Sequence, residues 1–153
     1  FIPKMGARVM SLGAPENKMS KSDPDGCVFL MDSPEMVQRK FKRAITDSDT
    51  ENCVRFDPEN KPGVANLMSI YSAVTGKSFE EIEREFDGRG YGDFKAAVGE
   101  CTADGLAPVR EEFARLIQDK AHLEAVMKAG AEEAAYYARK TMSKVRRKIG
   151  FVG

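Results

Sequence analysis

Two lysines three positions apart, Lys18 and Lys21, have the residue type and spacing of a pair that binds phosphate groups. Ser20 and Ser22 accompany them in a polar loop over residues 13–26. Lysine carries a compact charge and three donors on a flexible stem, so two lysines and nearby hydroxyls can follow charge toward a leaving pyrophosphate. Donors that bind the transition state better than the ground state accelerate such a reaction. A solvated loop that only keeps the surface soluble is the alternative.

The elements around this loop can be read from the spacing of apolar residues. Residues 7–12 alternate loosely and predict a short strand before the loop. Residues 28–30 predict a second short strand or the lead into a helix. From residue 33 onward, capping residues and apolar stripes predict helices. We expect them to begin near Pro34, Pro62 and Ser78, then to cover about 93–118 with a break at Pro108, a short helix after Asp119, and about 131–149.

Composition narrows the class of protein. The chain has 153 residues, of which 42% are apolar and 31% charged, which is a soluble globular balance. Basic and acidic residues number 24 each, so net charge gives no argument for nucleic acid or for an anionic membrane. Apolar runs are too short to span a bilayer. Three scattered cysteines and a single histidine argue against a disulfide framework and a structural zinc site, and predict a cytoplasmic protein. The chain begins with Phe1 rather than Met, which predicts a piece of a longer protein.

The string Lys18-Met19-Ser20-Lys21-Ser22 resembles the signature loop of class I aminoacyl-tRNA synthetases. Over essentially the whole chain the sequence is similar to the C-terminal part of bacterial tryptophanyl-tRNA synthetases. The stretches that carry this similarity are residues 6–12, 44–49, 61–67, 90–95, 130–132 and 149–151. The resemblance implies a mainly α fold. Residues 1–32 would form the C-terminal edge of a Rossmann-like α/β catalytic domain, and residues 33–153 an α-helical, anticodon-binding domain.

The resemblance also implies a reaction and its participants. In this family the tryptophan carboxylate attacks the α-phosphate of ATP, pyrophosphate leaves, and the tryptophanyl group passes to tRNA(Trp). Mg²⁺ is expected to arrive with ATP, because no carboxylate pair indicates a dedicated metal site. A homodimer is a further expectation. The implied catalytic residues are Lys18 and Lys21, and the implied ATP-binding residues are Val9, Met10, Lys18, Met19, Ser20, Lys21 and Ser22.

The family's other ATP-binding motif and its tryptophan pocket are missing from this sequence. Without the positioning that a substrate pocket supplies, we expect no catalysis from this chain alone. Two alternatives stay open: a non-catalytic, tRNA-binding helical module, and the sibling tyrosyl-tRNA synthetase. The retained Met19-Ser20 pair and an end soon after Gly150 favour the tryptophan enzyme.

Six basic residues and no acid occupy positions 139–148. They can bind tRNA phosphates, or they can simply favour the dipole at the C-terminal end of a helix. The resemblance favours tRNA and points to Arg139, Lys140, Lys144, Arg146 and Arg147. A second basic candidate is the helix that carries Arg39, Lys40, Lys42 and Arg43.

Two further polar features lie between the predicted helices. Asp47 and Asp49 flank Ser48, and we expect them to close a turn and support a hinge rather than to bind metal. Tyr91 stands among glycines, where it can be either a stacking platform or a packing residue.

Overall fold

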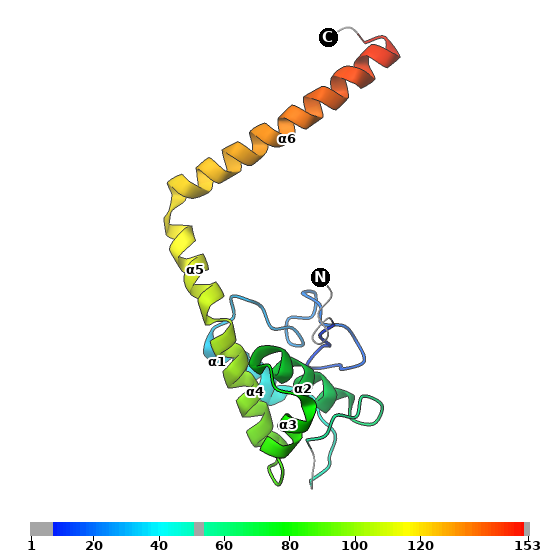
Figure 1. Cartoon of the computed structure of the whole chain (residues 1–153), viewed down its shortest axis with the longest axis vertical. Helices are drawn as coiled ribbons and strands as arrows, with labels where there is room; N and C mark the ends of the chain where they lie inside the picture. Colours follow the sequence, from blue (N-terminus) through cyan, green and yellow to red (C-terminus); the bar gives the residue numbers. More distant parts are fainter. Residues whose placement is uncertain (1–7, 51–53, 152–153) are drawn as a thin grey trace. The chain divides into compact units, whose positions relative to one another are not determined.

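The computed structural model describes residues 8–50 and 54–151, and in those residues every regular element is a helix. The chain divides into two compact units, residues 1–110 and 111–153, with the boundary inside the fifth helix. Figure 1 shows the helices in chain order. They are α1 (Pro34–Arg43), α2 (Pro62–Thr75), α3 (Phe79–Glu85), α4 (Tyr91–Gly105), α5 (Ala107–Gln118) and α6 (Lys120–Ile149).

The ends of the helices follow the local signals in the sequence. Ser33 caps α1 by accepting a hydrogen bond from the Met36 amide, with Pro34 in the first turn. Gly76 ends α2 in the left-handed conformation, at φ 76°. Ser78 and Glu81 form both halves of a capping box at α3. The predicted starts of these helices are therefore confirmed, and so is the end of α2 at Gly76.

The core of the first unit lies where α1, α2 and α4 pack together. Phe41, Leu67 and Phe94 are at most 1% exposed. Gly99 of α4 allows close packing against α1, because a Cβ there would stand 3.2 Å from the Cα of Gln38. Helical spacing from Val37 and Phe41 predicts that Ile45 continues the apolar stripe of α1. Ile45 is instead 52% exposed, because α1 ends at Arg43 and the chain turns away from helical geometry at Ala44.

The strand predicted over residues 7–12 is absent from the described part of that stretch, 8–12, where only one isolated bridge joins Met10 to Lys18. Ala7 lies outside the described residues. A strand requires a neighbouring strand to pair its N–H and C=O groups. Here those groups are satisfied otherwise: Leu12 donates to Gly26 and accepts from Ile45. The fold is mainly α, as expected.

The helices after residue 90 match the prediction in one place and differ in another. Pro108 divides the predicted stretch into α4 and α5, as expected. The predicted short helix after Asp119 and the last helix are instead one continuous helix, α6, of 30 residues. Gly130 lies inside it, and a glycine costs a helix interior only about 1 kcal/mol, which is too little to end it. None of the residues of α6 is buried.

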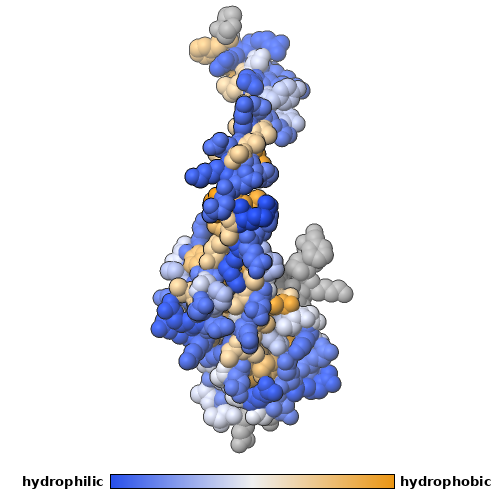
Figure 2. All heavy atoms as spheres, turned by 90° about the vertical axis from the view of Figure 1, so that its left-hand side faces the viewer, coloured by the Kyte–Doolittle hydropathy of each residue, from blue (hydrophilic) through white to orange (hydrophobic). Residues whose placement is uncertain are grey.

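Hydrophobic and hydrophilic side chains are mixed on the surface. Figure 2 shows hydrophobic residues lying among hydrophilic ones on the face in view. On α6 the exposed apolar side chains include Met127, Met142 and Ile149. Among the described residues, no helix combines the length and hydropathy needed to cross a membrane.

Candidate functional site

The lysine loop over residues 13–26 presents its charged side chains to solvent. Lys18 and Lys21 are both exposed, as are Ser20 and Ser22, whereas Met19 is half-buried and packs against the core. The Ser20 hydroxyl accepts a hydrogen bond from the Ser22 amide at 3.3 Å, which tightens the turn. One apolar residue thus anchors the loop and leaves the two lysines free to meet a polyanion.

Val9 and Met10 lie directly before the loop and are half-buried. The Met19 amide donates to the Val9 carbonyl at 3.0 Å, so the loop folds back on this segment. Both backbone groups of Met10 bind one side chain: its N–H donates to Asn66 Oδ1, and Asn66 Nδ2 donates to its carbonyl, each at 2.9 Å. Asn66, on α2, therefore supplies the pairing that a neighbouring strand would supply in a sheet.

Asn66 was assigned no role in the sequence analysis. It is 6% exposed, and its neighbours Leu67 and Met68 are fully buried. An amide among apolar residues on a buried helix was the available signal, because a buried polar side chain must find partners. The partner itself, 56 positions away along the chain, leaves no trace in local spacing.

A second set of polar contacts joins the segment before the loop to the last residues of the loop. The Ser11 hydroxyl donates to Asp23 Oδ2 at 3.2 Å, and the Gly26 amide donates to Asp23 Oδ1 at 3.2 Å. A Cβ at Gly26 would overlap both Ser11 Oγ and Asp23 Oδ2, so only glycine fits against them without a rearrangement. Asp23 thereby joins the start and the end of the loop.

Lys40, expected to belong to a basic helix face, turns toward the loop instead. Its ammonium donates to the Cys27 carbonyl at 2.7 Å and pairs with Asp32 at 2.6 Å. The side chains of Lys40 and Asp32 are only 11% and 13% exposed. Lys40 also lies 4.8 Å from the centre of the Phe29 ring. Arg39, Lys42 and Arg43, by contrast, are exposed.

A cavity of about 380 Å³ lies between the loop and α1. Asp23 and Asp25 line it from the loop, and Arg39 and Arg43 line it from α1. The walls therefore carry both positive and negative charges, so the cavity does not favour an anion over a cation. None of the predicted ATP-binding residues lines this cavity.

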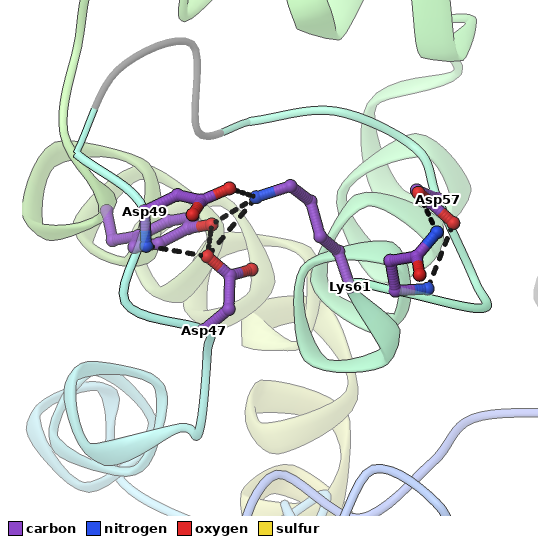
Figure 3. A network of polar contacts seen from close by, with 6 residues as sticks. Asp47, Asp49, Asp57 and Lys61 are labelled. Carbon is purple, nitrogen blue, oxygen red and sulfur yellow. Dashed lines mark hydrogen bonds and ion pairs between the residues drawn. The ribbon is translucent and has the colours of Figure 1, made fainter.

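Asp47, Lys61 and Tyr91 form a polar network that joins the turn after α1 to the N-cap residue of α2 and the first residue of α4 (Figure 3). Lys61 Nζ lies 3.2 Å from both Asp47 Oδ1 and the Tyr91 hydroxyl, and it also pairs with Asp49. The Tyr91 hydroxyl donates to Asp47. The expected turn is present, and Tyr91 holds it through its hydroxyl group.

The network shifts the acidity of its members. Burial alone would raise the pKa of Asp47, but hydrogen bonds from Tyr91, the Asp49 amide and Lys61 outweigh it and hold that pKa below its usual range. For Tyr91, burial and the hydrogen bond to Asp47 both raise the pKa of the phenol. Burial lowers the pKa of Lys61, yet its hydrogen bonds to Asp49, Tyr91 and Asp47 raise it overall. Each group is thus held in the charge state it has at neutral pH.

The five residues predicted to bind tRNA lie in the last three turns of α6. All five are exposed, and the ion pairs found among the described residues include none of them. These five positive charges are therefore accessible to a polyanion. They are Arg139, Lys140, Lys144, Arg146 and Arg147.

Metal ligands do not gather in the part of the chain that the structure describes. Within residues 8–50 and 54–151, no three His, Cys, Asp or Glu side chains come together as a metal site requires. Asp47 and Asp49 are neighbours, but they share a lysine instead.

Comparison with curated proteins gives close relatives. The chain is 46% identical over 151 residues to a tryptophan–tRNA ligase of Oceanobacillus iheyensis, covering 97% of this chain and 45% of that protein. It is 47% identical over 154 residues to a tryptophan–tRNA ligase of Wolinella succinogenes, covering 99% of this chain and 46% of the relative. The chain thus spans less than half the length of these relatives.

Solved structures of similar fold point the same way. A tryptophanyl-tRNA synthetase from Campylobacter jejuni complexed with ADP and tryptophane matches at TM-score 0.75 and 26% identity, covering 97% of this chain and 45% of that one. A tyrosyl-tRNA synthetase from Aeropyrum pernix matches less well, at TM-score 0.54 and 25% identity over 77% of this chain and 36% of that one. The tryptophan branch is therefore favoured over the tyrosine branch.

A family model described as "tRNA synthetases class I (W and Y)" matches residues 2–106. This match covers more than half of the chain and includes the lysine loop, Asn66 and the Asp47 network. The chain therefore belongs to the class I tRNA synthetases of the tryptophan and tyrosine group.

Proposed function

We propose that this chain acts within a tryptophan–tRNA ligase, in which it supplies the loop that binds the ATP phosphates and the helices that bind tRNA. The ligase would join the tryptophan carboxylate to the α-phosphate of ATP, release pyrophosphate and transfer the tryptophanyl group to tRNA(Trp). The observation that carries the proposal is the Lys18-to-Ser22 string on an exposed loop, in a chain 44–47% identical to tryptophan–tRNA ligases.

The lysines and the serines of the loop make different contacts with ATP. Lys18 and Lys21 contact the phosphates, and Lys21 stabilises the charge that develops on the leaving pyrophosphate. Ser20 and Ser22 add hydroxyl and amide donors to the same groups. The exposure of both ammonium groups supports this assignment, because a lysine already paired with a carboxylate would have to break that pair first.

Val9 and Met10 make the surface on which the adenine of ATP rests, and Met19 packs beneath the loop. Mg²⁺ enters with the ATP phosphates as part of the substrate, since the described residues offer no cluster of metal ligands of their own. The exposed basic residues of α6 bind tRNA phosphates. We further propose that the ligase is a cytoplasmic homodimer.

Activity requires a polypeptide of the length of the relatives. This chain spans about 45% of them, and we expect the pocket that positions tryptophan in the remaining part of the ligase. Since positioning supplies much of the rate of a two-substrate reaction, the 153 residues alone should not form the adenylate.

The test is amino-acid-dependent ATP–pyrophosphate exchange by the full-length polypeptide, offered tryptophan and tyrosine separately. Exchange with tryptophan alone supports the proposal. Exchange with tyrosine alone moves the chain to the sibling enzyme, and exchange with neither leaves a non-catalytic, tRNA-binding helical module, to be tested next by RNA binding.

The role of Lys21 is tested in the same assay. Replacing Lys21 by Ala should lower kcat by about 100- to 1000-fold, as removal of a transition-state donor does. Lys120→Ala, at an exposed lysine of α6 outside the basic cluster, is the matched control and should keep the rate. A rise in the tryptophan KM with kcat unchanged would show that Lys21 does not act in the transition state.

A further inference from the structure

We infer that Asn66 and Lys40 are positioning residues for the ATP step, because they fix the two ends of the lysine loop to α2 and α1. The inference rests on the proposed function, and it names two residues that touch no substrate atom in that proposal. The two contacts are independent: they come from different helices and bind the chain before and after the loop.

The first contact holds the upstream end. The Asn66 amide uses its acceptor and a donor on one residue, Met10, at 2.9 Å each, which fixes both the position and the orientation of that peptide segment. Met10 is bridged in turn to Lys18. A displacement of Met10 is therefore passed directly to the first of the two lysines.

The helix that carries Asn66 cannot adjust easily to such a displacement. Val64, Leu67 and Met68, on either side of Asn66 in α2, are at most 1% exposed. Close packing of this kind leaves little room for a shift of the helix. Asn66 thus transmits the position of the core to the adenine-facing segment and to the loop.

The second contact holds the downstream end. Lys40 binds the Cys27 carbonyl, directly after the loop, and the Asp32 carboxylate, next to the N-cap residue of α1. Its charge is nearly buried and neutralised by Asp32, so it is not available to bind an anion. The ammonium instead fixes residues 27–32 against α1, whose Val37 and Phe41 are in the core.

Between these two points Leu12 is buried and accepts from the Ile45 amide, and Met19 makes an apolar contact with the core. The lysines themselves are exposed, and the bonds of the loop to Asp23 and Ser20 stay within the segment 11–26. The polar contacts that fix the two ends therefore contribute to the placement of Lys18 and Lys21 relative to ATP. A displacement of about 1 Å of a group that acts in the transition state can lower a rate by about 100-fold.

The experiment uses the full-length polypeptide in ATP–pyrophosphate exchange with tryptophan. Asn66→Ala should lower kcat by about ten- to a hundredfold, with a smaller change in the tryptophan KM. Lys40→Met, which keeps the stem and loses the ammonium, should also lower kcat. Asn60→Ala is the matched control: Asn60 is exposed, and its amide donates to Asp57. Lys120→Met is the control for Lys40, and both controls should keep the rate.

Asn66→Asp separates positioning from a general loss of structure. As a carboxylate, Asp can accept from the Met10 N–H but cannot donate to the Met10 carbonyl. Once protonated, it can do both. The rate of Asn66→Asp relative to wild type should therefore rise as pH falls, while the melting temperatures of the two proteins are recorded at each pH.

Amide hydrogen exchange of the same full-length variants gives a second measurement that does not depend on activity. The amides of Met10 and Met19 should lose protection in Asn66→Ala, whereas those in the middle of α4 should not. If wild type exchanges pyrophosphate but Asn66→Ala and Lys40→Met keep its kcat, the positioning role is wrong. If wild type shows no exchange, the proposed function fails instead, and unchanged protection at Met10 would then overturn the anchoring as well.

Discussion

The carboxylate of Asp47 receives hydrogen bonds from Tyr91, Lys61 and the Asp49 amide. Its pKa is held below the ordinary value of 3.8, so the network contributes stability above that pH and loses it as pH falls through the lower pKa of the folded state. Asp47→Asn should cost about 1–3 kcal/mol of unfolding free energy at pH 7. The unfolding free energies of wild type and Asp47→Asn should then approach each other below about pH 4.

Urea unfolding of wild type and Asp47→Asn at several pH values between neutral and acid measures this difference. Other carboxyls, such as Asp57 and Glu81, also have lowered pKa values and add to the acid sensitivity of both proteins. Subtracting the two curves isolates Asp47. A difference that stays constant down to acid pH would mean that the lost contribution is packing and not the charge.

Gly63 offers a second test at the scale of a single residue. It lies in the first turn of α2, and a Cβ there would overlap the Ile45 carbonyl oxygen, which is backbone and cannot swing aside. Gly63→Ala should therefore destabilise by about 1–3 kcal/mol, as overpacking does. Gly92, in the first turn of α4, has open space where a Cβ would stand: apart from its chain neighbours and the nearby backbone of its own helix, no heavy atom lies within 4 Å. Gly92→Ala is therefore the matched control.

Thermal or urea unfolding of the two variants beside wild type compares them. Gly92→Ala should be neutral or slightly stabilising, because alanine restricts the unfolded chain. Equal stability of Gly63→Ala and Gly92→Ala would show that the turn after α1 can move away from α2, and that this approach is not tight in solution.

At the scale of the element, local sequence signals were enough to predict where helices form. Contacts between residues far apart in the sequence could not be predicted in this way. Ser33, Gly76 and the Ser78–Glu81 box each act within a few residues of themselves, so spacing alone finds them. The segment before the loop has the composition of a strand, but its pairing comes from Asn66, which is 56 positions away. Composition cannot predict such a partner, and the strand prediction was wrong for that reason.

The candidate site shows the same division. The lysines of the loop were singled out by residue type, spacing and the resemblance of their string, and their role toward a polyanion stays a prediction; the structure shows that both are exposed. The inward turn of Lys40 could not be predicted, because its neighbours Arg39 and Lys42 have the same charge and point to solvent. What distinguishes Lys40 is the return of Asp32 and Cys27 to its side of α1, which is a tertiary contact.

The capping box of α3 gives a prediction for a whole element. The Ser78 hydroxyl accepts from the Glu81 amide, and the Glu81 carboxylate accepts from the Ser78 amide. The helix is only 7 residues long, so its cap is a large share of its stability. Ser78→Ala should cost about 0.5–2 kcal/mol.

Urea unfolding measures that cost, and Ser48→Ala, at a serine in the turn after α1, is the control. Loss of the cap should also speed amide exchange in α3 more than in α4. Ile82 of α3 is fully buried. If Ser78→Ala and Ser48→Ala are equally stable, the packing of Ile82 is enough to hold α3 in place without its cap.

At the scale of the whole molecule, a net charge of zero conceals a strong separation of charge. Basic and acidic residues balance at 24 each over the chain, yet positions 139–148 hold six basic residues and no acid. On α6 the apolar residues Met142, Val145 and Ile149 recur at helical spacing and share one face, which leaves the rest of the circumference to the basic side chains. A phosphate backbone can therefore meet several of these charges along one side of the helix.

This separation predicts how tRNA binding by the full-length polypeptide should respond to salt. Binding that neutralises phosphates weakens as salt rises, and each lost phosphate contact lowers the slope of log K against log salt by about 1. Arg146→Glu together with Arg147→Glu should weaken binding of tRNA(Trp) and reduce that slope. Lys120→Glu with Lys128→Glu makes the same charge change on the same helix outside the cluster. If both pairs change affinity and slope equally, only the total charge of α6 matters, and the cluster at 139–148 is not the tRNA contact.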